Sequence, residues 1–366
     1  MLKNLHIINY RNIQQADLEM CGGINCFVGA NGAGKTNLLD AVYYLSFTKS
    51  VFCLVDSQNI HHGEPFFVLQ GTYNIDGDEH TIYCGCKRGA KKQFKLDKVD
   101  YKRLAEHIGY QPLVIISPSD EMLIAEGPDA RRKYADSVIS QCNKRYLDAL
   151  MQYNQLLQQR NTLLKQMQEQ ENNNFDLLDV FDTQMATLGN IITEARRNFV
   201  NWLQPIVCKY YNQIADAQES VDMNYISCTD RYSLYEGFVQ SRQRDVILGY
   251  TSRGVHKDDI DFLLDGFSIK NVGSQGQRKS FVISLKLAQY QYISEHNKHY
   301  PLLLLDDIFD KLDEHRGNRL ISLVAENNFE QIFISDTNRN RLMNVLNKVG
   351  KDFRIFSVNN GKVTTE

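Results

Sequence analysis

The stretch that decides the fold of this chain is Gly29-Ala30-Asn31-Gly32-Ala33-Gly34-Lys35-Thr36. The apolar run 24–28 before it predicts a buried strand, and apolar residues at helical spacing in 37–45 predict a helix after it. Glycines at such a junction let backbone N–H groups approach phosphate oxygens, and the helix N-terminus adds its positive dipole end. The stretch therefore predicts a phosphate-binding loop, in which Lys35 reaches the β- and γ-phosphates and Thr36 holds Mg²⁺. A glycine-rich turn without a ligand is the alternative.

Two acidic residues, Asp306 and Asp307, end the apolar run 301–305, which predicts another buried strand. At the end of a rigid strand, Asp306 can bind Mg²⁺ through water, and Asp307 can position or deprotonate an attacking water. A capped helix start would have the same local sequence. The presence of the phosphate loop in the same chain favours the nucleotide site.

A third motif, Gly-Ser-Gln-Gly-Gln at 273–277, precedes an amphipathic helix predicted over 278–290. Its hydroxyl, its close-approach glycine and its helix-end N–H groups suit a γ-phosphate. Its spacing from the phosphate loop resembles the ATP-binding cassette class, in which the signature of one subunit meets the ATP held by another. One chain would then hold half of each site, and 311–313 (Lys-Leu-Asp) would correspond to the loop that crosses the interface.

These motifs define the expected site of ATP and Mg²⁺. The residues expected to act in catalysis are Lys35, Ser274, Asp306 and Asp307, and those expected to hold Mg²⁺ are Thr36 and Asp306. The residues expected to bind the nucleotide are Gly29, Ala30, Asn31, Gly32, Ala33, Gly34, Lys35, Thr36, Asn37, Ser274, Gly276 and Gln277.

Composition limits the class of protein. The 366 residues carry a net charge of −3, so any nucleic-acid site must be a local basic patch. No stretch approaches the ~20 apolar residues of a membrane span, and no secretory segment is evident at the N-terminus. The eight cysteines have no zinc-ligand spacing and indicate reduced thiols. We therefore expect a cytoplasmic protein without a membrane partner.

The remaining pattern predicts an α/β fold: a P-loop NTPase core, an antiparallel β-subdomain over 66–96, and an inserted helical arm. Two helical stretches, 146–167 and 181–199, keep a 4-3 apolar rhythm that only Arg160 interrupts, which predicts a short antiparallel coiled coil. Strands are expected after the two helical stretches, at 221–226, 246–250 and 260–264. The predicted domains are an ATPase head formed by 1–118 and 250–366, and an arm formed by 119–249.

The chain resembles the RecF family of bacterial recombination-mediator ATPases within the ATP-binding cassette superfamily. A short arm separates it from the SMC relatives, which carry hundreds of residues of coiled coil there. The resemblance rests on six segments in the family's order: 9–13 (Asn-Tyr-Arg-Asn-Ile), 28–37, 116–120 (Ile-Ser-Pro-Ser-Asp), 127–134 (Gly-Pro-Asp-Ala-Arg-Arg-Lys-Tyr), 254–259 (Gly-Val-His-Lys-Asp-Asp) and 305–313.

The resemblance implies a DNA-binding ATPase of replication, recombination and the response to DNA damage. Such a protein dimerises with itself when it holds ATP, clamps duplex or gapped DNA, and releases it after hydrolysis. With RecO and RecR it would help to load RecA at gaps; direct binding of single-stranded DNA is also possible.

Two positions depart from the cassette pattern. Asp307 stands where many of these ATPases have glutamate; aspartate is one methylene shorter, which predicts slow turnover. Asp336-Thr337 stand after the next strand, where a histidine often senses the γ-phosphate, so the sensor is not identified. The glutamine-bearing loop has two candidates, Gln70 and 117–120, and Arg11 lies either near the nucleotide or on the surface.

Several assignments stay open at this level. A transporter-type cassette subunit and a cassette-linked nuclease are the alternative functions. The basic positions between 87 and 103 predict either a DNA phosphate contact or a solvated hairpin tip. Two interpretations are open for Arg131, Arg132 and Lys133, which either contact DNA or pair with the core. Further candidates for DNA contact are Arg242 and Arg244. The role of 256–259 is unassigned.

Overall fold

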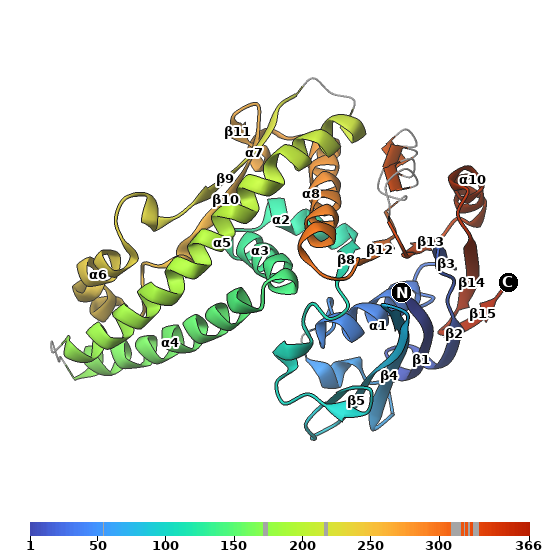
Figure 1. Cartoon of the computed structure of the whole chain (residues 1–366), viewed down its shortest axis with the longest axis horizontal. Coiled ribbons are helices and arrows are strands. Elements are labelled where there is room, and N and C mark those ends of the chain that lie inside the picture. Colours follow the sequence, from blue (N-terminus) through green and yellow to red (C-terminus); the bar gives the residue numbers. More distant parts are fainter. Residues whose placement is uncertain are drawn as a thin grey trace. The chain divides into compact units, whose positions relative to one another are not determined.

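The computed structural model of the chain (Figure 1) describes residues 1–53, 55–170, 175–215, 219–308, 316–317, 319–320, 323–324 and 329–366. It contains two compact units, each described here by itself. Unit one comprises Met1–Asp120, Gln213–Ala215 and Lys286–Glu366, and unit two comprises Glu121–Asn212 and Asp216–Leu285. The predicted head and arm divide the chain differently, because they assign 250–285 to the head. Antiparallel pairing of strands β9 (Val221–Ile226) and β10 (Asp259–Leu264) holds that segment in unit two.

The first sheet of unit one has the strand order β15-β14-β3-β13-β12-β8. Neighbouring strands from β14 to β8 run parallel, and β15 closes the edge antiparallel. Every residue of β3, β8, β12 and β13 is buried, as expected of parallel strands covered on both faces. The bounds are β3 Ile24–Val28, β8 Leu113–Ile116, β12 Leu302–Asp306, β13 Ile332–Asp336, β14 Phe353–Asn359 and β15 Lys362–Thr365.

The second sheet of unit one is antiparallel, in the order β2-β1-β4-β5-β6-β7. Helix α1 (Lys35–Phe47) contacts strands of both sheets, and almost all of its side chains are buried. The predicted β-subdomain is confirmed, and it includes the N-terminal strands. The bounds are β1 Leu2–Tyr10, β2 Ile13–Glu19, β4 Phe66–Ile75, β5 Asp78–Lys87, β6 Gln93–Leu96 and β7 Val99–Asp100; helix α10 spans Arg339–Val349.

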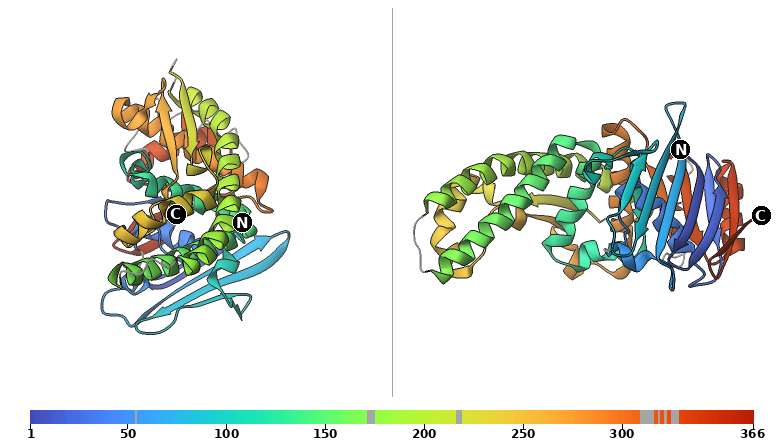
Figure 2. Two further views of the ribbon diagram at one scale, coloured as in Figure 1. Left: turned by 90° about the vertical axis from the view of Figure 1, so that its left-hand side faces the viewer. Right: turned by 90° about the horizontal axis from the view of Figure 1, so that it is seen from below.

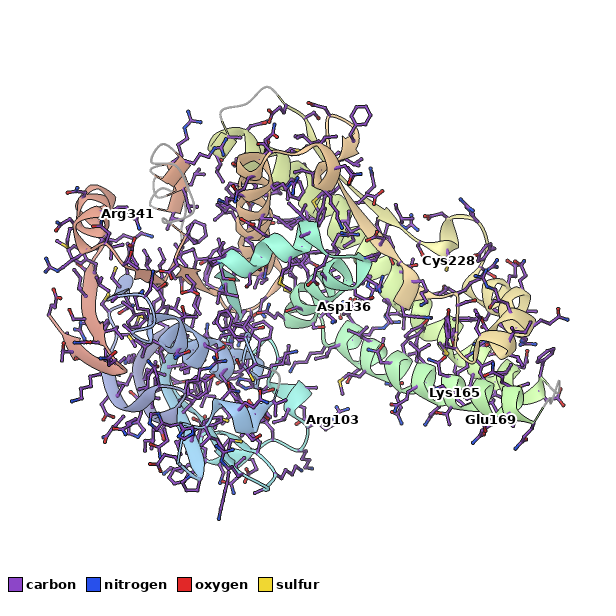
Figure 3. All side chains as sticks on the ribbon, turned by 180° about the vertical axis from the view of Figure 1, so that it is seen from behind. Arg103, Asp136, Lys165, Glu169, Cys228 and Arg341 are labelled. Carbon is purple, nitrogen blue, oxygen red and sulfur yellow. The ribbon has the colours of Figure 1, made fainter. Side chains whose placement is uncertain are left out.

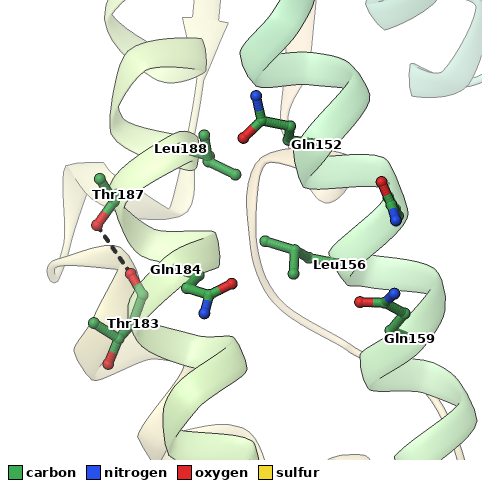
Figure 4. Close-up of a pocket in the computed structure, with 8 residues that line it drawn as sticks. Gln152, Leu156, Gln159, Thr183, Gln184, Thr187 and Leu188 are labelled. Carbon is green, nitrogen blue, oxygen red and sulfur yellow. Dashed lines mark hydrogen bonds between the residues drawn. The ribbon is translucent and has the colours of Figure 1, made fainter.

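Unit two contains the predicted helical hairpin, formed by α4 (Lys144–Glu169) and α5 (Asp176–Ala215), which run side by side (Figures 1 and 2). Most of the predicted apolar positions at both ends of α4 are buried, including Tyr146, Tyr153, Leu164 and Met167. Between the two helices lies a groove of about 430 Å³ (Figure 4). It is lined by Gln152, Gln155, Leu156, Gln159, Thr183, Gln184, Thr187 and Leu188.

The predicted strand at 246–250 is wrong, because helix α6 (Leu234–Leu248) covers most of it. Ser233 and Glu236 form a capping box at its start, and Gly249 ends it in the left-handed conformation. The other elements of unit two are α2 Met122–Ala125, α3 Pro128–Cys142, β11 Phe267–Ser268 and α7 Ile269–Val272; helix α8 spans Gln275–His296.

Candidate active site

The phosphate loop lies between β3 and α1, as predicted. Gly32 and Gly34 have φ angles of 78° and 118°, which favour glycine, and a Cβ at Gly29 would lie 2.2 Å from the carbonyl oxygen of Val358. Lys35 Nζ donates hydrogen bonds to the carbonyl oxygens of Gly29 (3.0 Å) and Ala30 (3.1 Å). The ammonium group is therefore held inside its own loop by two uncharged acceptors.

The acidic strand end lies beside the loop helix. Thr36 Oγ1 donates to Asp306 at 2.9 Å (Oδ1) and 3.1 Å (Oδ2), and Ser335 Oγ donates to Asp306 Oδ1 at 2.7 Å. Register explains the second contact, because β12 and β13 run parallel with Asp306 opposite Ser335. The backbone N–H of Asp307 donates to Ser335 Oγ at 3.0 Å, and its φ of 45° marks a sharp turn out of the strand.

Thr36 and Asp306 have the chemistry expected of a Mg²⁺ site. A hydroxyl and a carboxylate, both oxygen donors of the kind this ion prefers, lie within hydrogen-bond distance of each other. Burial raises the pKa of the Asp306 carboxyl above its ordinary value, while the hydrogen bonds from Ser335 and Thr36 oppose this shift. The residues present therefore fit the ion that the phosphate loop implies.

The turn between β1 and β2 braces the loop through Asn12. Its Nδ2 donates to the Ala33 carbonyl at 3.1 Å, and its Oδ1 accepts from Asn37 Nδ2 at 2.7 Å. Asn37, a predicted nucleotide ligand, thus has its amide on Asn12. No role was predicted for Asn12, although an amide side chain in a turn was a signal in the sequence.

The signature motif lies in unit two, at the start of α8. The backbone N–H of Gln277 donates to Ser274 Oγ at 3.2 Å, and the N–H of Ser274 donates to Gln277 Oε1 at 2.6 Å. This reciprocal pair is a capping box in the sequence Ser-Gln-Gly-Gln. Ser274 is exposed and Gly276 half-buried, so the helix N-terminus faces solvent in this unit.

Comparisons with known proteins decide the family. A model described as "RecF/RecN/SMC N terminal domain" matches residues 1–364. The chain is 49% identical over 364 residues to the "DNA replication and repair protein RecF" of Bacteroides fragilis, covering 99% of this chain and 98% of the relative. It is 48% identical over 364 residues to the protein of the same description from Bacteroides thetaiotaomicron, with the same coverage. The chain belongs to the RecF family.

Solved structures agree with this assignment. The structure described as "the recombination mediator protein RecF-ATP in RecFOR pathway" matches with a TM-score of 0.88 and 30% identity, covering 100% of this chain and 99% of that one. An Smc head domain from Pyrococcus furiosus matches with a TM-score of 0.60 at 15% identity, covering 100% of this chain and 96% of that one, which shows a shared fold. The predicted fold class, a cassette-type core with a β-subdomain and a helical arm, is thereby confirmed.

Other residues singled out from the sequence of this RecF-family chain have identifiable contacts in the structure. Arg11 is held by Asp40 (3.2 Å) and by Ser50 Oγ (3.0 Å), so it connects the turn after β1 to the middle of α1 and to the segment that follows this helix. Asp336 accepts from the N–H of Asn338 and pairs with Arg341 at 2.7 Å, and Thr337 follows it. Figure 3 labels Arg341. The segment 311–313 lies outside the described residues.

Both candidates for the glutamine-bearing loop lie in unit one. Gln70 lies opposite His6 within the antiparallel sheet. The stretch 117–120 is closed by the Asp120 side chain, which accepts from the N–H of Ser117 at 2.8 Å and pairs with Lys286 at 2.7 Å. Both positions stay predictions.

The family motif 127–134 meets the motif 254–259 within unit two. Arg131 grips Asp259 through two hydrogen bonds, 2.8 Å (Nε–Oδ1) and 2.9 Å (Nη2–Oδ2), and Arg132 donates to the carbonyl of Asp258. Arg196 connects the same region by pairing with Asp136 (Figure 3) and donating to the Val255 carbonyl at 2.8 Å. Arg131 and Arg132 therefore have internal partners, which favours their interpretation as core pairs.

The basic segment 87–103 is mixed in its surroundings. Lys92 turns inward, where its Nζ donates to the Thr48 carbonyl (2.6 Å) and pairs with Asp56 (2.7 Å). Lys87, Arg88, Lys91 and Lys98 are exposed.

Among the described helices, none is both long and apolar enough to cross a membrane.

Proposed function

We propose that this RecF-family chain is an ATPase that uses ATP to switch its binding to DNA in recombinational gap repair. The observation that carries the proposal is the phosphate loop, where Lys35 donates to two uncharged carbonyl oxygens and Thr36 contacts Asp306. The relatives described as RecF-ATP and as DNA replication and repair proteins support it.

The residues of the loop suit phosphoryl chemistry. Lys35 can leave the carbonyls of Gly29 and Ala30 for phosphate oxygens, because an ammonium gains more from an anion than from a neutral carbonyl. Thr36 and Asp306 would hold Mg²⁺, and the bound ion would neutralise part of the negative charge of the phosphates. Asp307 would orient or deprotonate the attacking water, and its short side chain predicts slow turnover.

The signature would complete the site in trans. Ser274, Gly276 and Gln277 lie at a solvent-facing helix N-terminus, which is suited to a phosphate held by a second copy of the chain. ATP would then join two chains into a clamp on duplex or gapped DNA, and slow hydrolysis would release it. We propose RecO and RecR as partners in loading RecA, and a cytoplasmic location.

The proposed DNA surface includes exposed basic side chains of the β5–β6 hairpin and of the turn between β6 and β7. Lys87, Arg88, Lys91 and Lys98 are exposed, whereas Lys92 is held by Asp56 and Thr48. Cations that are not already neutralised gain most from a phosphate backbone.

The proposal is tested with Asp307→Asn, which keeps the nucleotide site but removes the proposed base. With ATP, this variant should double in mass by light scattering and bind duplex DNA more tightly than without ATP, at a fixed salt concentration. Ser274→Arg should bind ATP and stay monomeric. Absence of DNA binding in both nucleotide states would reject the clamp and return the transporter-type alternative.

A further inference from the structure

The signature glutamine is held by a residue that no motif includes. Gln277 Nε2 donates to Glu219 Oε1 at 2.6 Å, and Tyr211 Oη donates to Glu219 Oε2 at 2.9 Å. Glu219 is half-buried, and Tyr211 is a fully buried residue of α5. All three residues belong to unit two. Both carboxylate oxygens are therefore in use, one on the signature and one on the long helix.

The backbone next to Glu219 is fixed as well. The N–H of Ser220 donates to Asp265 Oδ1 at 2.8 Å, and the N–H of Asp265 donates to the Ser220 carbonyl at 2.7 Å. Asp265 lies in the turn between β10 and β11, so the segment that carries Glu219 is tied to the three-stranded sheet. The carboxylate is consequently presented to Gln277 from a rigid base.

An acceptor at this place decides which way the Gln277 amide faces. The two ends of a side-chain amide have nearly the same shape, but only the NH₂ end can donate to a carboxylate. With Nε2 on Glu219, Oε1 is left to accept the N–H of Ser274, which is the contact found in the capping box. The box in turn holds Ser274 Oγ against the N–H of Gln277 and leaves the N–H groups of Gln275 and Gly276 outside it.

We infer that Glu219 is a positioning residue for the signature: it fixes the Gln277 amide, and through it the Ser274 hydroxyl, in the arrangement that receives the γ-phosphate of a second chain. This inference rests on the function proposed above. It assigns to Glu219 no contact with the nucleotide, because its role is exerted through Gln277. Donors whose orientation is fixed before the ligand arrives lose less conformational freedom on binding, which strengthens phosphate binding.

The first test is Glu219→Ala, with ATP-dependent doubling of mass as the readout. Loss of a charge-assisted hydrogen bond at the signature should weaken ATP-driven dimerisation by about tenfold or more. Binding of a fluorescent ATP analogue to the monomer should not change, because the phosphate loop is intact. Glu236→Ala is the matched control: it removes the corresponding capping box of α6 in the same unit and should dimerise like the unmodified chain.

A donor–acceptor exchange keeps the inference testable even if Glu219→Ala unfolds. Gln277→Glu alone places two carboxylates face to face and should abolish dimerisation with ATP. Adding Glu219→Gln restores a hydrogen bond with donor and acceptor exchanged, so the double variant should recover part of the dimer. Melting temperatures of all variants are measured alongside, because a purely structural role would change stability and leave dimerisation at saturating ATP intact.

The outcomes separate the two claims. If the unmodified chain does not double in mass with ATP, the proposed function fails. If it does, and Glu219→Ala dimerises equally well or better while the exchange recovers nothing, the role of Glu219 is overturned and the proposed function stands.

Discussion

Two buried cations, Lys35 of unit one and Arg160 of unit two, are held in opposite ways. Lys35 in unit one is 4% exposed and donates to two uncharged carbonyls. Arg160 in unit two is 0% exposed and pairs with two buried carboxylates, Asp182 and Asp245, each at 2.8 Å. Among the residues that the structure describes, no carboxylate lies within 4 Å of the Lys35 ammonium.

This difference in partners indicates that the charge of Lys35 serves ligand binding, whereas the charge of Arg160 serves the stability of the fold. A buried ion is costly unless it is paired and hydrogen-bonded. Arg160 has its counter-charges within the chain, so nothing outside is needed. Lys35 has no ion pair of this kind among the described residues and interacts with the Asp306 carboxylate only through space, so its ammonium group favours an incoming anion where the phosphate is expected.

The largest expected effect comes from removing the paired cation. Arg160→Met leaves Asp182 and Asp245 facing each other without their shared partner and should lower the free energy of unfolding by about 3–5 kcal/mol. Urea denaturation followed by circular dichroism measures this. Arg242→Met is the matched control, since Arg242 binds Asp182 from the other side (2.7 Å) but also pairs with half-exposed Asp179, so its loss should be smaller. Equal losses for the two variants would contradict the assignment of Arg160 as the central counter-charge.

A second effect compares buried histidines, one in each unit. His107 contacts the Leu45 carbonyl (2.6 Å) and the Tyr101 hydroxyl (3.0 Å), and His256 contacts the Thr251 carbonyl (3.0 Å) and the Tyr153 hydroxyl (2.9 Å). Burial lowers the pKa of each ring to about 4, from an ordinary value of 6.5. Both rings are therefore neutral in the folded chain above about pH 4.

The sign of the pH dependence follows from these values. Between pH 6.5 and 4 the unfolded chain binds a proton at each histidine and the folded chain does not, so these two histidines lower stability as pH falls through this window. Each should contribute a loss of about 2 kcal/mol between pH 7 and pH 5. Urea midpoints at the two pH values measure it. His107→Asn and His256→Asn should each remove a comparable part of the dependence; an unchanged dependence in either variant would place the lost stability elsewhere.

How far the sequence determined these features depends on how local they are. The strand, loop and helix of 24–45 and the acidic strand end at 306 were predicted, because their signals lie within a few residues of one another. The 4-3 spacing of apolar residues predicted the helical hairpin, but in that pattern Arg160 was only an interruption of the apolar positions. Its partner Asp245 is 85 residues away in the chain, and no periodicity reports such a pair.

The errors in the sequence analysis have physical causes of the same kind. The apolar run at 246–250 predicted a strand, and the capping signal that starts α6, Ser233 and Glu236, lies 13 and 10 residues before position 246. The hydrogen bond between Gln277 and Glu219 spans 58 residues and could not be anticipated from the motif. The sequence indicates which residues carry charged or reactive groups, and the fold decides which of these groups are already paired.

A third, smaller effect tests the cation without a counter-charge. Lys35→Ala should weaken binding of a fluorescent ATP analogue by at least about tenfold, because one charge-assisted contact to phosphate is lost. Unlike Arg160→Met, it should change the urea midpoint little, since Lys35 acts on the buried Asp306 carboxylate only through space and forms no close ion pair with it. A large loss of stability would show that Lys35 supports the fold as Arg160 does, and the distinction between the two cations would be lost.

The smallest effect concerns Arg131, which lies in a family motif and yet is paired like Arg160. Arg131→Lys keeps the charge but cannot form both hydrogen bonds to Asp259, so it should cost about 1 kcal/mol of stability. Duplex-DNA affinity and its salt dependence should stay the same, because a cation already held by a carboxylate contributes little to phosphate binding. Lys91→Gln on the exposed β5–β6 hairpin is the counterpart: it should reduce the salt dependence by about one phosphate contact and leave the urea midpoint unchanged. If Arg131→Lys instead changed the salt dependence and Lys91→Gln did not, the paired arginine would face DNA, and pairing within the chain would no longer distinguish structural from binding cations.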